Sequence, residues 1–420
     1  MNILIILVFT VLFVCTLFFG VYFYKQKKYI SSTIYFSLSF KLIIMLFMES
    51  GLKYYVALDG MKYEEDAWNL MKAVESNMQY LLDDFERQEY FNPFTQMSIL
   101  IFKLFGKHSS IIILVNIIAS LLCYVLSVEL FENLWPVQKK KSIWLNKAKL
   151  SLLLVLAAYP TFNIWSCTVT KDPLATLFAI LGLYYFFKSM QQKINFNSYT
   201  RLVFFTLAVS SFYISGLFRP YMLYLIFTGI LAGLGLYVIQ KIMPFVQSLL
   251  ATIVLFFTGL YIFEKINNDL FLEVCVYIEN LREGFLNAGN IDDLSKSAFL
   301  INYSFKTTWD YVLFFPQSVA QYFIGPYFWN IKSKAEAFGL LEALIIILLF
   351  KSFLRGAKKI IQFSRLEISV MFGIMVVFAF AQSLLIGNLG TIFRHRTFAF
   401  FIFFIISGAG LILEKEKTND

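Results

Sequence analysis

The chain has 420 residues, of which 59% are hydrophobic and 15% charged, and its mean hydropathy is +0.69. An ordinary soluble domain carries about 25% charged residues, so this composition excludes that class and indicates a protein that lies in lipid. The formal net charge of +9 comes from lysines and arginines in short connections between apolar runs; it indicates membrane orientation rather than a basic face that binds nucleic acid.

Long apolar runs take up most of the sequence. A run of about 20 apolar residues crosses the hydrocarbon core as a helix because all its backbone N–H and C=O groups are then bonded internally. We therefore expect an all-α polytopic membrane protein, a single integral membrane domain over residues 1–420 with about eleven transmembrane helices. The predicted spans are 2–24, 29–48, 109–131, 150–168, 173–188, 201–217, 220–240, 245–263, 337–354, 366–387 and 397–413.

The basic residues of the short loops predict the orientation. They fall in alternate connections, which the positive-inside rule places in the cytoplasm. Clusters are found at Lys25–Lys28, Lys139–Lys149, Lys188–Arg201, Lys241 and Lys351–Arg365. This arrangement predicts an outer N-terminus, a cytoplasmic C-terminus, and the outer segments 49–108, 168–172, 218–220, 264–336 and 388–396. The first run ends in basic rather than small residues, so we expect a retained helix and not a cleaved signal.

The first outer segment, 49–108, contains two predicted surface helices. Residues 67–85 repeat apolar residues at helical spacing on one face, and residues 94–105 form a second, short apolar stretch. Both are expected to lie along the membrane surface. Asp59 falls just before the first of them and Asp66 at its start. Carboxylates at such a rim are either solvated loop charges or members of a site.

Two very short outer connections carry charges close to the lipid boundary. TVTKDP, 168–173, brings Lys171 and Asp172 there, and Pro173 favours the start of the next helix. The two charges either pair with each other and mark a helix end, or belong to a site. Arg219 lies in the same way between two apolar runs, where it either snorkels to headgroups or clamps a phosphate with its planar fork.

The third cluster is GNLGTIFRHR, 387–396. Its two glycines permit a tight turn with exposed N–H groups, and Arg394, His395 and Arg396 follow at the start of the last run. Arginines on the outer side oppose the positive-inside tendency, which favours anion binding. The four cysteines and two histidines show no disulfide framework and no zinc-ligand spacing. No cofactor is indicated with certainty, and a divalent cation stays open.

The first half of the chain resembles the polytopic glycosyltransferases that use polyprenyl-phosphate sugars, the GT-C fold with its family 39-like members. The resemblance rests on the segments LDGMKYEEDAW, NPFTQMSILIFKLFGKHSSIIILVNIIASLL and YPTFNIWSCTVTKDPLATLFAILGLYYF. The second half, with FFPQSVAQYFIGPYFWN and GNLGTIFRHR, looks like membrane proteins of bacterial capsule and exopolysaccharide clusters. The first outer loop contains several acidic residues, and the resemblance leaves open which of them is the catalytic acid.

The resemblance implies sugar transfer from a polyprenyl mono- or diphosphate to a glycan or lipid acceptor at the outer face of the bacterial plasma membrane. Such a reaction needs a carboxylate that takes the acceptor proton, for which Asp59 is the first candidate and Asp66 the second. It also needs cations that stabilise the leaving phosphate. Candidates for the phosphate site are Lys171, Asp172, Arg219, Arg394, His395 and Arg396.

Two other functions remain open at this point. A polymerase of lipid-linked oligosaccharide repeat units would use the same chemistry. A polysaccharide flippase or other transporter would also be polytopic and basic, but such proteins typically show internal repeats or helices broken at mid-membrane. The aromatic stretch 322–329, in the second large outer segment, is expected to be an interfacial belt or a cover that stacks on sugar rings.

Overall fold

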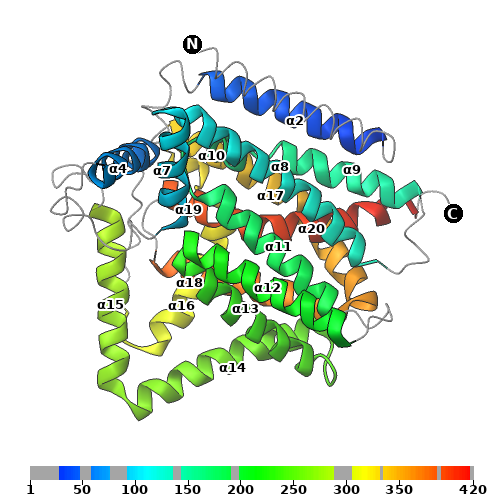
Figure 1. The fold of residues 1–420 in the computed structure, drawn as a ribbon. Coiled ribbons are helices and arrows are strands. Elements are labelled where there is room, and N and C mark those ends of the chain that lie inside the picture. Colours follow the sequence, from blue (N-terminus) through cyan, green and yellow to red (C-terminus); the bar gives the residue numbers. More distant parts are fainter. Residues whose placement is uncertain are drawn as a thin grey trace.

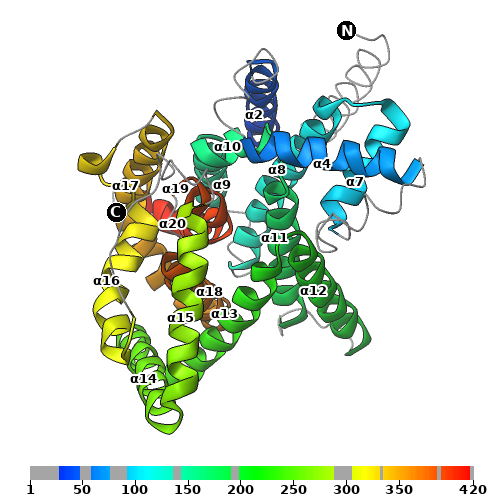
Figure 2. The same cartoon turned by 90° about the vertical axis from the view of Figure 1, so that its left-hand side faces the viewer.

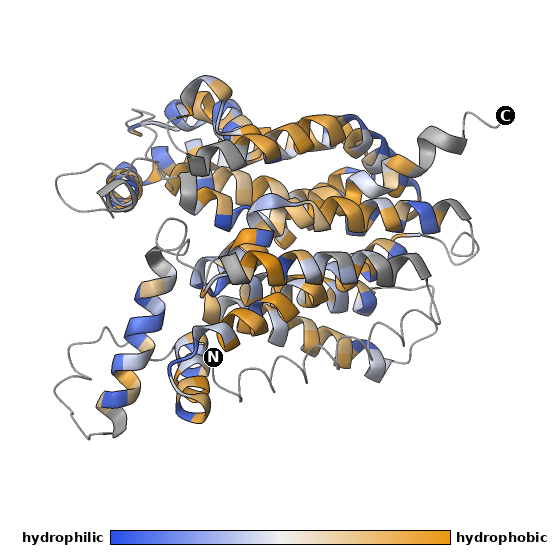
Figure 3. Ribbon diagram, turned by 90° about the horizontal axis from the view of Figure 1, so that it is seen from above, coloured by the Kyte–Doolittle hydropathy of each residue, from blue (hydrophilic) through white to orange (hydrophobic). Residues whose placement is uncertain are grey.

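The computed structural model describes residues 28–47, 58–75, 92–135, 143–190, 198–287, 305–331, 334–385 and 389–416. Within these ranges the secondary structure is helical and contains no strand. Most of the long helices run side by side across the view of Figure 1. Apolar residues dominate the middle of these helices, and polar residues gather toward their ends (Figure 3). The expected all-α polytopic class is confirmed.

Six helices of the described part are long and apolar enough to cross a membrane. They are α8 (Ser109–Asn133), α11 (Asp172–Met190), α12 (Ser198–Phe218), α13 (Pro220–Ile239), α14 (Phe245–Ile266) and α18 (Arg365–Leu385). Helix α14 is the most exposed of them, with 6% of its most apolar stretch buried inside the protein. Most of its exposed side chains are apolar, as a surface that faces lipid requires.

The predicted span 150–168 is not one straight helix. The chain forms α9 (Ile143–Ala157) and α10 (Pro160–Ser166), which meet at an angle of 62°. Pro160 explains the break, because a proline inside a helix lacks the N–H of the ladder and clashes with the preceding turn, whereas it is well tolerated in a first turn. The second piece therefore starts anew at Pro160.

The expected number of about eleven spans is not confirmed, since the structure supports six, or seven if the bent pair counts as one span. The run 2–24 lies outside the described residues. Helices α2 (Lys28–Phe47) and α20 (Thr397–Glu416) contain apolar stretches shorter than a full span. Helix α17 (Lys334–Phe363) has 30 residues, longer than the predicted run 337–354, and carries charged residues within that length.

Several helices outside the set of candidate spans lie toward one end of the bundle, and Figures 1 and 2 show α4 (Leu58–Glu75), α7 (Pro93–Phe105), α15 (Asn268–Asn287), α16 (Thr308–Ile324) and α19 (Leu389–His395) there. The 3-10 helix η3 (Phe328–Asn330) follows α16 in the chain. Helices α4 and α7 pack through edge-to-face rings, with Trp68 and Phe102 centred 5.9 Å apart. The predicted short helix at 94–105 is thus confirmed, whereas the first surface helix begins earlier than expected, at Leu58.

Glycines bring α13 and α18 into backbone contact. Gly229 and Gly233, spaced four residues apart on α13, face α18, and a Cβ on Gly229 would lie 2.6 Å from the Cα of Ile374. Small residues at this spacing let two membrane helices approach more closely than larger side chains would. The close contact places the start of α13 beside the last turns of α18, where the candidate site is found.

Candidate anion-binding site at one end of the bundle

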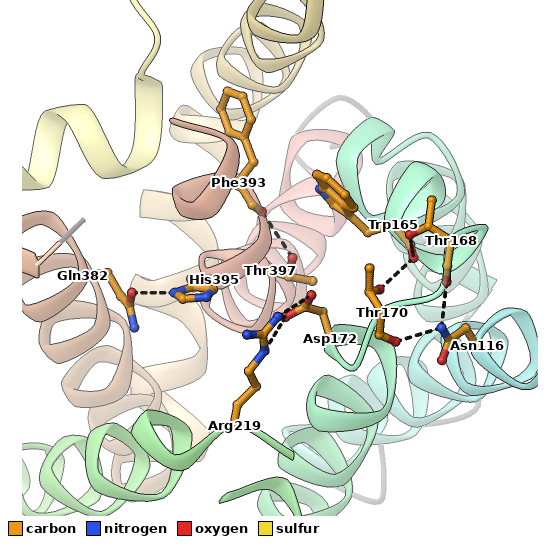
Figure 4. A network of polar contacts seen from close by, with 10 residues as sticks. All are labelled: Asn116, Trp165, Thr168, Thr170, Asp172, Arg219, Gln382, Phe393, His395 and Thr397. Atoms are coloured by element: carbon orange, nitrogen blue, oxygen red, sulfur yellow. Dashed lines mark hydrogen bonds and ion pairs between the residues drawn. The ribbon is translucent and has the colours of Figure 1, made fainter. Parts of the chain in front are cut away.

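Four segments that are distant in sequence meet at the end of the bundle where α11 and α13 begin. They are the connection before α11, the junction between α12 and α13, the last turns of α18, and α19. Figure 4 shows the polar side chains that they contribute. Asp172 and Arg219 face each other in the middle, His395 and Gln382 lie on one side, and Trp165, Thr170 and Asn116 lie on the other.

The centre of the site is an ion pair between Asp172 and Arg219. Arg219 Nε donates to Asp172 Oδ1 at 2.9 Å, and Nη2 donates to Oδ2 at 2.8 Å. Asp172 opens α11, where a carboxylate is favoured by the helix dipole. Arg219 precedes Pro220, which starts α13. The pair uses one edge of the guanidinium and leaves the edge with Nη1 outside it.

The loop that carries Lys171 is held by Asn116 of α8. The Asn116 amide nitrogen donates to the backbone oxygens of Thr168 and Thr170, both at 2.8 Å. The hydroxyls of the same two threonines donate to Trp165 O, at 2.9 and 3.2 Å. Backbone groups in a buried loop need such partners because water is not at hand. The loop is therefore set by bonds on both of its sides.

Two further cations lie against aromatic rings around the ion pair. Lys171 Nζ lies 5.0 Å from the ring centre of Tyr63 on α4, and the Arg394 guanidinium lies 5.1 Å from that of Trp165 on α10. Arg394 also interacts electrostatically with Asp172. Rings hold cations without neutralising them. Lys171 and Arg394 thus bring two further cationic side chains to this end of the bundle.

His395 is buried and contributes no charge. Its Nδ1 lies 3.0 Å from Gln382 Oε1, and its ring packs on Tyr221 with centres 4.4 Å apart. Burial, followed by the positive charge of Arg219, lowers the pKa of His395 well below its usual range. With Nδ1 bonded to an amide oxygen, the imidazole proton lies on Nδ1 and Nε2 is an acceptor. The gathering of Lys171, Arg219 and Arg394 at this end of the bundle favours an anionic ligand.

Arg396 belongs to a different, fully buried network. Its Nη1 donates to Tyr322 O at 3.2 Å and to Gly325 O at 2.9 Å, and its Nη2 pairs with Glu342 of α17. The side chains of both partners are at most 1% exposed. A phosphate role for Arg396 stays a prediction that this environment does not favour. The adjacent Tyr322, placed in the expected aromatic cover, is likewise buried, whereas Trp329 is exposed.

The candidate bases lie on α4. Asp59 is in the first turn of that helix rather than before it, and its side chain lies outside the described part of the structure. Asp66 is half-buried and follows Tyr63 by three residues, which is close to one helical turn. Because Tyr63 contacts Lys171, α4 borders the cation cluster. The structure thus brings α4, Lys171, Asp172, Arg219, Arg394 and His395 to one end of the bundle.

Sequence reasoning missed the polar residues inside the predicted spans. Asn116, Gln382, Lys41 and Glu342 all lie within apolar runs, and all are buried and hydrogen-bonded in the described structure. A polar or ionisable side chain inside a membrane helix is itself a signal, since its burial is costly unless it has a partner or a function.

Potential metal ligands do not cluster in the described ranges, where no group of three or more histidine, cysteine or acidic side chains is placed to hold an ion. Comparisons with known proteins give no relative: no family model, curated protein or solved structure matches the chain.

Proposed function

We propose that the chain is a membrane glycosyltransferase that transfers sugar from a polyprenyl phosphate or diphosphate carrier at the extracytoplasmic face, in the synthesis of a cell-surface polysaccharide. The observation that carries the proposal is the gathering of three cations at the ends of apolar helices. Arg219 pairs with Asp172, Arg394 interacts electrostatically with the same carboxylate, and Lys171 lies against Tyr63 of α4. Such a cluster suits a phosphate whose lipid tail lies in the bilayer.

The position of the cluster fits a lipid-borne substrate. Phosphates of a carrier lie just outside the hydrocarbon core, and the cluster lies where α11 and α13 begin and α12 ends. The outer face follows from the alternating basic loops. A soluble phosphate would need no such placement beside a bilayer.

The proposed chemistry divides between α4 and the cation cluster. A carboxylate of α4, Asp59 or Asp66, takes the proton of the acceptor hydroxyl. At the same time the oxygen of that hydroxyl forms a bond to the anomeric carbon of the sugar. The bond from that carbon to the phosphate oxygen breaks, and the electron pair stays on the phosphate. Arg394 and Lys171 then stabilise the added negative charge, and Arg219 contributes through its outer edge. A repeat-unit polymerase would use the same steps with a longer transferred glycan.

The test is turnover of a polyprenyl-phosphate sugar by the purified protein in lipid nanodiscs. Asp59→Asn and Asp66→Asn keep side-chain volume but remove the proton acceptor, so one of them should abolish product while the amount of folded protein stays unchanged. Glu65→Gln, an exposed neighbour on the same helix, is the matched control. Normal product from both aspartate variants would remove α4 from the chemistry, and no turnover of mono- or diphosphate donors by the wild type would remove the proposal.

A transporter of lipid-linked glycans is the second candidate, and the broken helix favours it. Helices interrupted within the membrane, such as α9 and α10, are typical of substrate sites in transporters. Reconstituted proteoliposomes distinguish the two functions. Movement of a fluorescent polyprenyl-linked sugar between leaflets, without formation of a new glycosidic bond, would support the transporter.

A further inference from the structure

Helix α10 is the element on which the candidate site depends most directly. It carries Trp165, and the loop with Thr168 and Thr170 connects it to Lys171. With seven residues it is too short to be stable by itself. Both of its ends meet a buried ionisable side chain from another part of the chain, and the two side chains have opposite charge.

A carboxylate bonds to the start of α10. Glu342 Oε1 accepts from the backbone N–H of Thr161, in the first turn, at 2.8 Å. The first N–H groups of a helix have no partner within it and carry the positive end of its dipole. The other carboxylate oxygen pairs with Arg396, which balances the buried charge. Glu342 of α17, held by Arg396 from the turn before α20, thereby fixes where α10 begins.

A lysine lies at the end of α10. Lys41 Nζ of α2 donates to the Oγ of Ser166, the last residue of the helix, at 2.6 Å. In return, Cys167 Sγ donates to the backbone oxygen of Lys41 at 3.3 Å. The Lys41 side chain is fully buried, with Nζ 5.3 and 5.4 Å from the ring centres of Tyr124 and Phe162. A cation at the C-terminal end of a helix is the favourable arrangement.

We propose that Glu342 and Lys41 are positioning residues, which hold α10 from its two ends and so set the place of Trp165, Lys171 and Asp172. The inference rests on the proposed function for its effect on catalysis, but the placement of α10 can be tested without any reaction. Fixed ends of α10 also distinguish the two candidate functions. If α10 moved during transport, its contacts with Glu342 and Lys41 would have to break.

Hydrogen exchange followed by mass spectrometry, on the full chain in nanodiscs, measures the placement directly. In Lys41→Met, amides of residues 161–172 should exchange at least tenfold faster, while those of α13 and α18 keep their rates. Lys149→Met is the matched control, because Lys149 is nearly as buried and pairs with Glu132 away from α10. If Lys41→Met does not fold, Ser166→Ala decides, since it removes the hydroxyl and leaves the lysine in place.

For the other end of α10, Glu342→Gln keeps an acceptor for the Thr161 amide but loses the charge, and residues 161–163 should exchange at least threefold faster. Exchange within twofold of wild type over 161–172 in the Lys41 and Ser166 variants, or an equal rise in α13, would overturn the proposal.

Turnover of the lipid-linked sugar then tests the link to function. Lys41→Met and Ser166→Ala should lower kcat at least tenfold with a smaller change in KM, because the carrier still meets Arg219 and Arg394. Faster exchange in a protein whose wild type has no turnover would keep the positioning role and reject the glycosyltransferase. Faster local exchange with unchanged kcat would show that α10 does not serve the reaction and would overturn its assigned purpose.

Discussion

Two arginines at the same end of the bundle pair with carboxylates, and the surroundings of the two pairs differ. The Arg219 side chain is 13% exposed and uses one edge for Asp172, and Arg394 also interacts electrostatically with that carboxylate. The Arg396 side chain is 0% exposed and is bonded to Glu342 and two backbone oxygens. The first pair is partly open and has a further arginine nearby, as the proposed phosphate site requires, whereas the second pair joins α17 to the start of α20 in the core.

The largest effect is expected at the buried pair. Glu342→Ala leaves the Arg396 charge buried without its carboxylate, which costs about 3–5 kcal/mol of folding free energy. Thermal unfolding in detergent should show a much larger loss than for Asp172→Ala, because Arg219 can reach water. Glu273→Ala, on the exposed side of α15, is the control. An equal fall in unfolding temperature for Glu342→Ala and Asp172→Ala would contradict the inferred difference between the two ion pairs.

The next effect concerns the edge of the Arg219 guanidinium that the pair with Asp172 does not use. Arg219→Lys keeps the charge and the orientation signal but loses the planar fork, so sugar turnover should fall roughly 30- to 1,000-fold, about 2–4 kcal/mol of transition-state stabilisation. Arg365→Lys is a matched control, because Arg365 donates to Gln240 O away from the cluster. A rate within about threefold of wild type for Arg219→Lys would mean that any cation serves here.

A smaller effect is expected from His395, through pH. Burial and then Arg219 lower the pKa of folded His395, whereas an unfolded histidine takes up a proton near pH 6.5. Below that pH the unfolded state therefore binds more protons, and stability falls as the pH falls. Wild type should lose up to about 1.4 kcal/mol per pH unit more than His395→Gln between pH 6.5 and 5.5. Unfolding midpoints across this range check it, with His108→Gln as control; parallel curves would contradict a neutral His395.

The smallest effect is expected at the ring beneath Arg394. Trp165→Leu removes a cation–π contact of about 0.5–1 kcal/mol, so binding of polyprenyl phosphate should weaken roughly two- to fivefold. Microscale thermophoresis with the lipid in nanodiscs measures it. Trp309→Leu, at an exposed tryptophan of α16, is the control. Unchanged affinity would place Arg394 outside the phosphate contacts.

Much of this end of the molecule was predictable because it follows from short-range constraints. A helix must end where an apolar run stops, and such ends carry Lys171, Asp172, Arg219 and His395. Because successive connections lie on alternate sides of the membrane, every second connection falls on the same side. The count of spans was less predictable. Hydropathy averages over Pro160, so α9 and α10 appeared as one span.

The sequence by itself determined the helical membrane class, the approximate extent of the six spans that the structure supports and the set of charges at the rim, because a long apolar run satisfies its backbone in lipid by forming a helix. Only the tertiary structure decided which charges act together. Arg394 and Arg396 are two residues apart and look equivalent in the sequence, yet the turn at the start of α20 sends one to the Trp165 ring and the other into the core with Glu342. The partners Lys41, Glu342 and Asn116 come from distant helices, and hydropathy carries no information about which helix faces which.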